Sequence, residues 1–406
     1  MNQDYSTPAT VRAHNLSFTI NLIRERGTIT RAELNQITHL SPTTISALVN
    51  VLIASGFVNE AGIGVSSGGR RPVVLEFNYD ARYTLGVDMG ATHITVIIMK
   101  LNGDVIYRST RNVDVIHEPI PSLDVILEMI QAALADCRLT YDDLLGVGFT
   151  VPAPLINENT GEFLTYYMPD WAGIFPVNYL RKNIDMPIYV ENDANSAALA
   201  EKHWGSGRGY DNLAYIKLGT GVGSGLIIDN EIYRGVNGNA GEIGHTTIEA
   251  AGRLCRCGNH GCIESYVGIP GLLRDVREGL MKVPAWQNKL ENLEIEQIIE
   301  SAQSGNEVCV QVIDKAGKYL GIGIANLVNL FNPGLVVIGG ELTAAGKLFL
   351  DPMQASIRER SIPFGIHREK LVLGELGADA VAIGAATLVM MNAFNEVNLY
   401  QTLRKK

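Results

Sequence analysis

The chain has 406 residues, of which 46% are hydrophobic and 19% are charged, and its formal net charge is −10. This length suggests two or three domains, and the acidic balance excludes binding of nucleic acid over the whole surface while leaving room for a small DNA-binding domain. No run approaches the roughly 18 apolar residues of a membrane span. The first residues also lack the features of a signal peptide, so we expect a cytoplasmic protein.

The first predicted elements are short helices near the start of the chain. Residues 15–26 carry apolar side chains at helical spacing and are followed by a glycine that can end the helix. Thr30 is suited to cap a second helix over residues 31–38, because Glu33 follows it at the spacing of a capping box.

A third helix is predicted to begin after Ser41, a suitable N-cap, with Pro42 at its first helical position. Its apolar residues form an inward stripe, and its small polar residues point outward. A short helix, a tight turn and a further helix of this kind are typical of a helix-turn-helix. The side chains expected to contact DNA from this helix are Ser41, Thr43, Thr44, Ser46 and Asn50.

Two predicted strands, over residues 56–60 and 72–77, flank a glycine-rich loop that contains Arg70 and Arg71. This pattern predicts a β-wing, and arginine in a flexible loop suits phosphates or a narrow minor groove. The alternative is a three-helix packing module with a surface hairpin. We favour DNA binding through residues 1–80, because the helix polarity, the wing and the arginine pair coincide.

After Tyr83 the pattern changes to strands and helices, and one design occurs twice. In the first copy a buried strand enters a glycine turn at residues 88–92 and returns as a second strand. In the second copy residues 212–218 enter the turn at residues 219–225 and return in the same way. The repetition predicts two similar α/β lobes around a cleft, which is a natural ligand site.

The two glycine turns and Gly339-Gly340 place backbone N–H groups where no Cβ blocks a phosphate. Taken singly, such turns are often only tight hairpins. As a set they resemble the phosphate clamps of actin, hexokinase and chaperone ATPases. This resemblance implies a two-lobed actin- and hexokinase-like body built from a ribonuclease-H-like repeat.

Asn192 and Asp193 follow an apolar strand and precede a predicted helix over residues 194–203. A carboxylate at this position can accept a proton from a substrate hydroxyl, as the general base of a kinase does. The alternative is that one of the two residues only caps the helix.

Three of the five cysteines lie close to a histidine: His245, Cys255, Cys257 and Cys262 fall within eighteen residues. Thiolate and imidazole are the ligands of closed tetrahedral zinc sites. The cluster fits a metal site in a reducing compartment better than a disulfide framework. Spacing alone leaves His260 as an alternative fourth ligand.

Two carboxylates accompany these residues. Glu242 precedes His245 by three residues, a separation that suits adjacent sugar hydroxyls, and Glu264 follows the last clustered cysteine. A metal that fixes this loop would hold both carboxylates rigidly for a hydroxyl-rich ligand. If His245 binds zinc through one ring nitrogen, the other needs a partner, and a ligand hydroxyl can be that partner.

The chain resembles the winged-helix regulators of the ROK family, which comprises repressors, open reading frames and kinases. The resemblance extends over essentially the whole chain, and it is strongest toward the branches that contain the xylose and N-acetylglucosamine repressors. The family signature is matched over residues 218–226 and continues through Gly235, Gly241, Gly244 and His245.

The resemblance implies roles for individual residues. A structural zinc ion would be held by His245, Cys255, Cys257 and Cys262. Sugar hydroxyls would be bound by Asn192, Asp193, Glu242, His245 and Glu264, with Asp193 as the catalytic base of an active kinase. In that case only, ATP and magnesium would lie against Asp88, Gly90, Thr92, Gly219, Thr220, Gly221, Gly339 and Gly340.

The expected architecture is therefore α/β, with an N-terminal winged helix-turn-helix followed by a two-lobed body. We expect a C-terminal helix that packs back on the first lobe. The expected boundaries are 1–80 for the DNA-binding domain, 81–190 for the first lobe, 191–380 for the second lobe with the zinc loop and sugar site, and 381–406 for the C-terminal helix.

Two positions depart from the family pattern. Kinase members usually carry Lys after the first glycine turn, where this chain has His93. Many members have Asn at the position of Asp170, and the exchange replaces a group that donates and accepts hydrogen bonds with one that only accepts. We expect the second change to alter the sugar preference.

Three functions fit these features. The first is a sugar-responsive repressor that binds operator DNA as a homodimer or homotetramer. The second is an ATP-dependent sugar kinase with a DNA-binding domain, and the third is a regulator sequestered by a membrane sugar transporter. We favour the first, because His93 departs from the kinase pattern and the sugar-binding set is intact.

Overall fold

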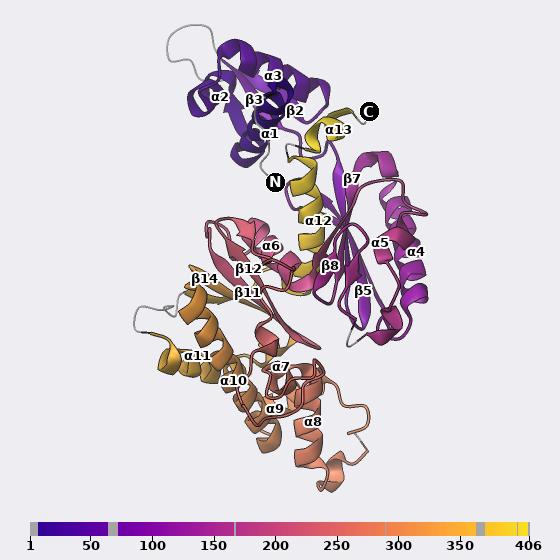
Figure 1. Ribbon diagram of the computed structural model, residues 1–406, viewed down its shortest axis with the longest axis vertical. Helices are drawn as coiled ribbons and strands as arrows, with labels where there is room; N and C mark the ends of the chain where they lie inside the picture. Colours follow the sequence, from indigo (N-terminus) through magenta and orange to yellow (C-terminus); the bar gives the residue numbers. More distant parts are fainter. Residues whose placement is uncertain are drawn as a thin grey trace.

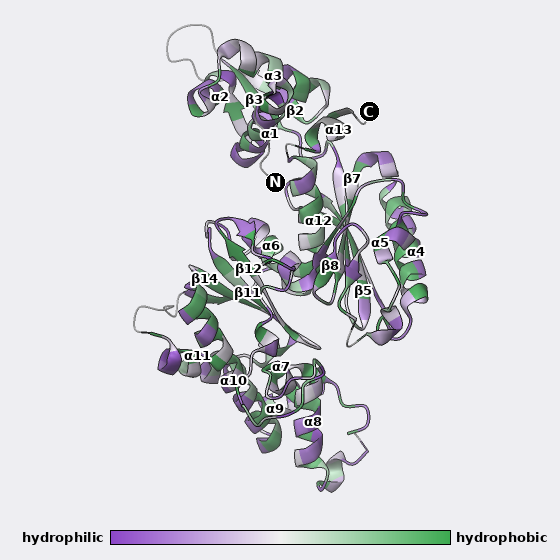
Figure 2. Ribbon diagram, in the orientation of Figure 1, coloured by the Kyte–Doolittle hydropathy of each residue, from purple (hydrophilic) through white to green (hydrophobic). Residues whose placement is uncertain are grey.

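Three structural units follow one another along the longest axis of the protein, from a winged helix at the N-terminus to a second α/β lobe at the opposite end (Figure 1). The computed structural model describes residues 7–63, 72–165, 168–288, 290–362, 370–395 and 397–404. Figure 2 shows hydrophobic residues along the central strands of both lobes and hydrophilic stretches on the surrounding helices.

Local capping fixes the helices of the winged helix. The Glu33 N–H donates to Thr30 Oγ1 at 3.2 Å, and the Thr30 N–H donates to the Glu33 carboxylate at 2.8 Å, so the predicted capping box is present. Helices α2 and α3 meet at 119°, an angle typical of a helix-turn-helix. The elements are α1 (Pro8–Arg26), β1 (Thr28–Thr30), α2 (Arg31–Thr38), α3 (Pro42–Ala54), β2 (Val58–Ile63) and β3 (Val73–Phe77).

Two details of this unit differ from the expectation. Helix α1 begins at Pro8 rather than near residue 15, because Thr7 caps it by accepting a hydrogen bond from the Thr10 N–H at 3.3 Å. Strand β1 was not predicted, because its three residues become a strand only by pairing with β3 in the order β1-β3-β2. The predicted wing tip, with Arg70 and Arg71, lies outside the described residues.

The first lobe is a five-stranded sheet in the order β10-β7-β4-β5-β6. Its central strand β4 pairs antiparallel with β5 and parallel with β7. All eight residues of β7 are buried, as expected for a strand covered on both faces. The elements are β4 (Tyr83–Met89), β5 (His93–Lys100), β6 (Val105–Asn112), α4 (Pro119–Cys137), β7 (Leu144–Val151), β8 (Leu155–Asn157), β9 (Glu162–Phe163), α5 (Pro176–Leu180) and β10 (Ile188–Asn192).

The second lobe repeats this plan in the order β13-β12-β11-β14-β15. Strand β11 takes the place of β4, because it pairs antiparallel with β12 and parallel with β14. The predicted two-lobed fold is thereby confirmed. The elements are β11 (Leu213–Leu218), β12 (Val222–Ile228), β13 (Glu231–Ile232), α7 (Glu264–Val267), α8 (Ile269–Leu280), α9 (Ile295–Gln303), α10 (Glu307–Phe331), β14 (Leu335–Gly340), α11 (Lys347–Arg360) and β15 (Leu371–Leu373).

Two helices connect the lobes by crossing between them. Helix α6 (Asp193–Trp204) follows β10 but packs on β11 and β12, whereas α12 (Ala380–Ala393) follows β15 but packs on β4 and β7. The helices also pack against each other. A Cβ at Gly148 would lie 1.9 Å from Ala385 O, and one at Gly384 would lie 1.7 Å from Ser196 O. Only glycine allows these backbones to approach so closely.

The end of α12 packs into the winged helix. Ser17 Oγ donates to Phe394 O at 2.6 Å, and the Phe394 ring meets Phe57 and Phe77 edge-on. The three phenylalanines belong to one buried cluster that includes residues of α1, α3, β3 and α12. The short helix α13 (Leu399–Arg404) completes the described chain beside α1. A buried apolar contact therefore joins the winged helix to α12.

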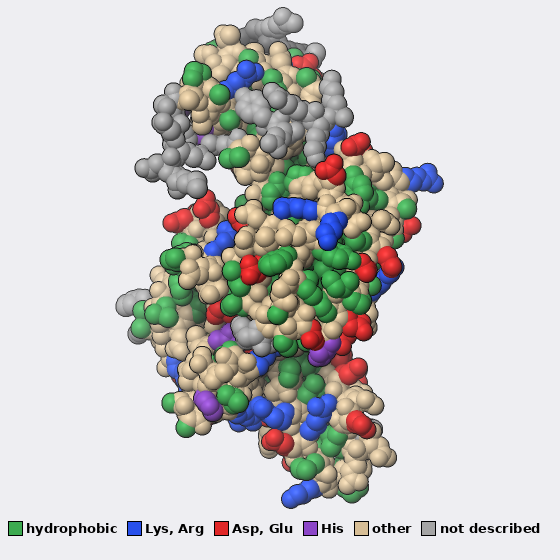
Figure 3. All heavy atoms as spheres, turned by 45° about the vertical axis from the view of Figure 1, so that its right-hand side comes forward, with side chains coloured by type: hydrophobic (Ala, Val, Ile, Leu, Met, Phe, Trp, Pro, Cys, Tyr) green, Lys and Arg blue, Asp and Glu red, His purple; other side chains and the backbone are tan. Residues whose placement is uncertain are grey.

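Among the described residues, no single helix is long and apolar enough to cross a membrane, although the bent pair α2 and α3 passes that test together by length and composition. The body also lacks a surface of one charge sign on the face shown in Figure 3, where acidic and basic side chains are interspersed. The residue numbers at which we divide the chain into domains stay a prediction.

Candidate functional site

The predicted sugar and nucleotide residues all line one cleft of about 460 Å³ between the lobes. The first lobe contributes the turn after β4, and the second contributes the turn after β11 and the end of β14. The loop that contains the cysteine cluster closes one side. These residues are Asp88, Gly90, Thr92, Asn192, Asp193, Gly219, Thr220, Gly221, Glu242, His245, Glu264, Gly339 and Gly340.

The glycine turns are closed by the protein itself. A Cβ at Gly90 would lie 2.5 Å from the His93 ring, and one at Gly221 would lie 2.5 Å from the Glu264 carboxylate. The Val222 N–H already donates to Glu264 Oε2 at 3.1 Å. In both turns the missing side chain of glycine leaves space for another side chain of the protein. These contacts agree with the alternative in which the turns are tight hairpins rather than phosphate-binding loops.

Asp88 is buried at the floor of the cleft. Its carboxylate accepts from Thr150 Oγ1 at 3.2 Å and lies 3.3 Å from His93 Nε2. The hydrogen bond to Asp88 raises the pKa of His93, although burial acts in the opposite direction. His93, which follows the first glycine turn, therefore pairs with the aspartate that precedes this turn.

Asp193 begins α6 and is paired with a residue that the sequence reasoning missed. Lys217 Nζ lies 2.6 Å from Asp193 Oδ2, and the Ala194 N–H donates to Asp193 Oδ1 at 2.7 Å. Burial lowers the pKa of Lys217, but the charges of Asp193 and Asp88 more than offset this, and the net shift is upward. The sequence contained one signal that could have identified Lys217, because it is a lysine within the otherwise apolar strand 213–218.

Asn192 is the N-cap of α6, because its side chain accepts from the N–H groups of Ala194 and Asn195 at 2.9 and 3.2 Å. The capping alternative thus applies to this residue, whose side-chain amide also donates to Ala153 O at 3.3 Å. The neighbouring Glu191 is buried and paired with Arg234 at 2.5 Å. Neither Glu191 nor Arg234 was predicted.

Glu242 and Glu264 face the same cleft but differ in their partners. Burial, with added repulsion from Asp193 and Glu264, raises the pKa of Glu242 to about 7. Glu264 accepts instead from Arg256 Nε at 2.8 Å. The sequence analysis did not identify Arg256 as a site residue. Its position between two of the clustered cysteines could have indicated that it lies near the cleft. The cleft therefore presents carboxyl groups in two different electrostatic settings.

The cysteine cluster has the dimensions of a tetrahedral metal site. The ligand atoms of His245, Cys255, Cys257 and Cys262 all lie within 4.8 Å of one another. Cys257 Sγ is 3.8 Å from Cys262 Sγ, and Cys255 Sγ is 3.7 Å from His245 Nδ1. Ligands about 2.3 Å from a central zinc would be separated by roughly 3.8 Å. The four residues therefore fit zinc.

The chemistry of the cluster supports the same assignment. Burial raises the pKa of Cys262 to about 12, and a divalent cation would supply the charge that favours thiolates. The alternative ligand His260 is exposed, and its Nδ1 lies 3.0 Å from Gly252 O, apart from the cluster. His245 Nε2 lies 3.8 Å from Glu242 Oε2, so this histidine connects the cluster to the cleft.

Asp170 does not lie where the sequence suggested. Its side chain is exposed, and it does not line the cleft, whereas the neighbouring Trp171 is buried and donates to Val115 O at 2.6 Å. Packing of the tryptophan turns the aspartate outward. An effect of Asp170 on sugar preference therefore has no support in the geometry.

The residues predicted to contact DNA lie at the N-cap of α3 and along the helix, and they differ in exposure. Ser41 and Thr43 are exposed, Thr44 and Ser46 are half-buried, and Asn50 is exposed. Ser41 caps the helix by accepting from the Thr44 N–H at 3.1 Å. The Asn50 side chain accepts from Arg31 at 3.4 Å, and Arg31 pairs with Glu60 at 3.0 Å. Their contacts with DNA stay a prediction.

Comparison with known proteins places this architecture in a family. Residues 84–392 match the ROK family. A xylose repressor from Caldicellulosiruptor bescii is 33% identical over 376 residues, which are 91% of this chain and 94% of that protein.

Two solved structures resemble the fold. A ROK family transcriptional regulator, described as a homologue of the E. coli MLC protein, aligns with a TM-score of 0.82 and 28% identity over 97% of this chain and 99% of its own. A ROK family glucokinase from Streptomyces griseus, solved with glucose and AMPPNP, aligns with a TM-score of 0.67 and 30% identity over 75% of this chain and 98% of its own. The chain therefore belongs to the ROK family, which includes both regulators and sugar kinases.

Proposed function

We propose that this protein is a sugar-responsive transcriptional repressor. The observation that carries the proposal is the path of α12. Near its start Val381 lines the cleft, and beyond its end Phe394 is buried in the winged helix. One rigid helix thus joins a ligand site to a DNA-binding fold, as a ligand-controlled repressor requires.

The DNA side of the proposal assigns α3 to the major groove and the wing to the adjacent backbone or minor groove. Two copies of the chain would place two recognition helices on the half-sites of a palindromic operator. We therefore propose a homodimer, or a tetramer built from dimers, that acts on DNA in the cytoplasm. The names of the relatives, a xylose repressor and a transcriptional regulator, support this assignment.

The ligand side assigns the cleft to a neutral sugar, with xylose as the first candidate because of the repressor relative. Glu242, Glu264 and Asp193 would accept hydrogen bonds from sugar hydroxyls, and His245 would meet one through Nε2. Zinc, held by His245 and the three cysteines, would supply only structural rigidity to this loop. To change DNA binding, the sugar would have to bind with different affinities to two arrangements of the lobes, one that binds DNA and one that does not.

The kinase alternative has one observation in its favour, since Asp193 stands at the start of α6 and the body resembles a glucokinase. Two contacts count against it. Lys217 already contacts Asp193 Oδ2 and would compete with a substrate hydroxyl for this oxygen, and the His93 ring fills the first glycine turn. We therefore propose that the cleft carries out no phosphoryl transfer.

Thermal unfolding of the full chain tests both functions. The ligands would be xylose, glucose and N-acetylglucosamine and their phosphates, each with and without ATP and magnesium. Stabilisation by one neutral sugar, unchanged by ATP, together with altered binding of promoter DNA by the same sugar, is the expected result. Sugar-dependent release of ADP would instead establish the kinase and overturn the repressor proposal.

A further inference from the structure

A polar strip of α1, formed by Ser17, Asn21 and Arg24, contacts the end of α12. These residues are four and three positions apart, so they share one face of the helix. Ser17 Oγ and Asn21 Nδ2 both donate to Phe394 O, at 2.6 and 3.3 Å. Arg24 Nη1 donates to Met390 Sδ at 3.2 Å. The strip therefore attaches the winged helix to the helix that begins at the cleft.

Arg24 is the member of this strip whose hydrogen bonds are poorly satisfied. Its Nη2 donates to Asn21 Oδ1 over a long 3.4 Å, and its Nη1 reaches only the sulfur of Met390, a weak acceptor. Among the described residues, the buried Nε has no hydrogen-bond partner and no carboxylate lies within 4 Å of the guanidinium. Burial lowers the pKa of Arg24. The docked winged helix thus contains a cation whose donors lack strong acceptors, which costs stability.

The end of α6 lies close to the same arginine. Trp204, the last residue of α6, packs against the buried cluster that joins the winged helix to α12, and its Nε1 donates to Thr387 Oγ1 of α12 at 2.8 Å. Burial lowers the pKa of the neighbouring His203 to about 4, and the charges of Arg24 and Lys202 add to this shift. Arg24 therefore lies where the ends of α6 and α12 both meet the winged helix.

Both of these helices begin at the interlobe cleft. Asp193, the first residue of α6, lines the cleft, as does Val381 near the start of α12. The helices pack on different lobes, α6 on β11 and β12 and α12 on β4 and β7 (Figure 1). Their close approach at Gly384 and Ser196 lies between the cleft and Arg24. A change in the angle between the lobes would therefore shift the two helix ends relative to each other beside Arg24.

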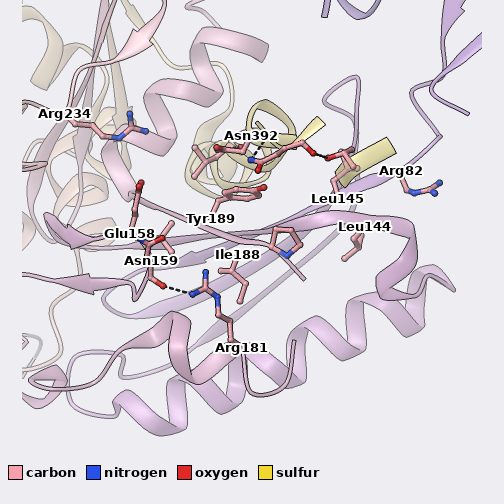
Figure 4. A pocket seen from close by; sticks show the side chains of 15 residues that line it. Arg82, Leu144, Leu145, Glu158, Asn159, Arg181, Ile188, Tyr189, Arg234 and Asn392 are labelled. Carbon is pink, nitrogen blue, oxygen red and sulfur yellow. Dashed lines mark hydrogen bonds between the residues drawn. The ribbon is translucent and has the colours of Figure 1, made fainter. Parts of the chain in front are cut away.

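The end of α12 has space on the side that does not face α1. Leu388 and Asn392 line a cavity of about 580 Å³, which Arg82, between the winged helix and the first lobe, also lines (Figure 4). Met390 is two positions from both Leu388 and Asn392, so it points to the other side of the helix. The helix end can therefore tilt toward the cavity without displacing closely packed atoms.

We propose that Arg24 transmits the arrangement of the two lobes to the winged helix, a role that rests on the proposed repressor function. The poorly satisfied guanidinium narrows the free-energy gap between the docked junction and an arrangement in which Arg24 reaches solvent. A sugar that changes the angle between the lobes then needs less differential affinity to move the winged helix. Arg24 is thus a positioning residue for DNA binding and does not contact the sugar.

Hydrogen exchange at the end of α12, measured on the full chain, reports the stability of the junction without any sugar. Arg24→Met keeps an apolar stem but removes the cation, so exchange should slow by about tenfold, as expected when a buried donor without a partner is removed. Arg24→Lys retains a cation and should stay near the wild-type rate. Arg26→Met, at an exposed position in the same last turn of α1, is the matched control and should leave the rate unchanged.

The same variants test the transmission. Fluorescence anisotropy gives the sugar response, which is the ratio of promoter affinities without and with saturating xylose. Because the docked junction becomes about tenfold more favoured, Arg24→Met should reduce this ratio by up to about tenfold. Arg24→Lys and Arg26→Met should keep the wild-type ratio.

Faster or unchanged exchange in Arg24→Met, or loss of its fold, would overturn the proposal, because the guanidinium would then stabilise the junction. A wild-type sugar response in Arg24→Met would overturn it too. A different pattern would count against the repressor function instead: promoter binding of the wild type that ignores xylose, glucose and N-acetylglucosamine, with exchange that still slows in Arg24→Met. The two proposals therefore fail in distinguishable ways.

Discussion

Lys217 Nζ lies 2.6 Å from Asp193 Oδ2, so the first strand of the second lobe is tied to the first residue of α6. The aspartate is the proposed base of the kinase alternative. An ammonium group at this distance competes with a substrate hydroxyl for the carboxylate oxygen. This pair is one of the two contacts that we weigh against the kinase alternative.

The Lys217–Asp193 pair should contribute measurably to stability. Lys217→Met leaves a buried carboxylate without its cation and should lower the free energy of unfolding by about 1–3 kcal/mol. Adding Asp193→Asn should restore part of that loss, because no charge then lacks a partner. Urea unfolding of the wild type, both single variants and the double variant gives the coupling energy. Lys318→Met, which breaks an exposed pair with Asp314, is the matched control and should cost under about 1 kcal/mol.

Additive effects of the two substitutions on the free energy of unfolding would show that Lys217 and Asp193 do not interact.

The Asp193→Asn variant also tests the proposed function. Asp193→Asn should leave DNA binding intact in a repressor, whereas a kinase would lose turnover. A loss of promoter binding in the Asp193→Asn variant, with unchanged folding, would contradict the assignment of DNA binding to the winged helix and of Asp193 to the cleft.

Zinc should be present at about one ion per chain when the purified protein is measured by elemental analysis. Cys257→Ser removes one ligand and should release the metal and lower the melting temperature, since the zinc loop would lose its anchor. Cys137→Ser is the control, because Cys137 lies on α4, outside the cluster. A folded wild-type protein without zinc, as stable with a chelator as without it, would refute the assignment.

The wing arginines should contribute to DNA affinity through phosphates. The double substitution of Arg70 and Arg71 by Ala should weaken promoter binding and reduce the slope of log K against log salt by about 2, one for each lost contact. Fluorescence anisotropy over a salt series measures both quantities. The double Ala variant of Arg358 and Arg360, on α11, should keep the wild-type slope. An unchanged slope in the wing variant would exclude these contacts.

Gly384 should tolerate no side chain. A Cβ there would lie 1.7 Å from Ser196 O, so Gly384→Ala must push α12 away from α6, at a cost of about 1–3 kcal/mol or more. Chemical denaturation measures the loss. Gly219→Ala is the control, because its Cβ would meet nothing within 4 Å, and its stability should stay near that of the wild type. Equal stability of the two variants would mean that the helices separate easily.

His203, near the end of α6, should make the protein sensitive to acid. Burial, assisted by Arg24 and Lys202, lowers its pKa from 6.5 to about 4. As the pH falls, His203 therefore binds a proton in the unfolded chain at a higher pH than in the folded protein. The contribution of the neutral, folded His203 to stability is complete above pH 6.5 and is lost as the pH falls towards 4. The loss amounts to at most about 3 kcal/mol. Unfolding free energies at several pH values should show a shallower decline for His203→Gln than for the wild type.

Local sequence signals predicted the elements whose cause is local. The capping box of Thr30 and Glu33 set the start of α2, and Ser41 with Pro42 set the start of α3. Strand β1 was missed because its three residues have no pattern of their own and depend on β3. The start of α1 was also missed, since an N-cap at Thr7 lay beyond the apolar periodicity.

In the candidate site, too, features with a local cause were predicted and features that depend on distant residues were not. The clustered His245, Cys255, Cys257 and Cys262 were recognisable because their spacing along the chain is short. The partners of the cleft acids were not, because Lys217 is separated from Asp193 in sequence and meets it only through the packing of α6 on β11. The exposure of Asp170, outside the cleft, was likewise not evident from the sequence, because it depends on the burial of the neighbouring Trp171.

The sequence by itself indicated the N-terminal helices, the repeated lobes and the cysteine cluster, because caps, periodicity, glycine turns and ligand spacing are local properties. The resemblance to the ROK family added the fold class and the candidate residues of the cleft. Tertiary structure decided what surrounds each of those residues. It paired Asp193 with Lys217 and Asp88 with His93, and it joined the cleft to the winged helix through α12. These contacts depend on which distant side chains share a buried space, and chain order does not specify that.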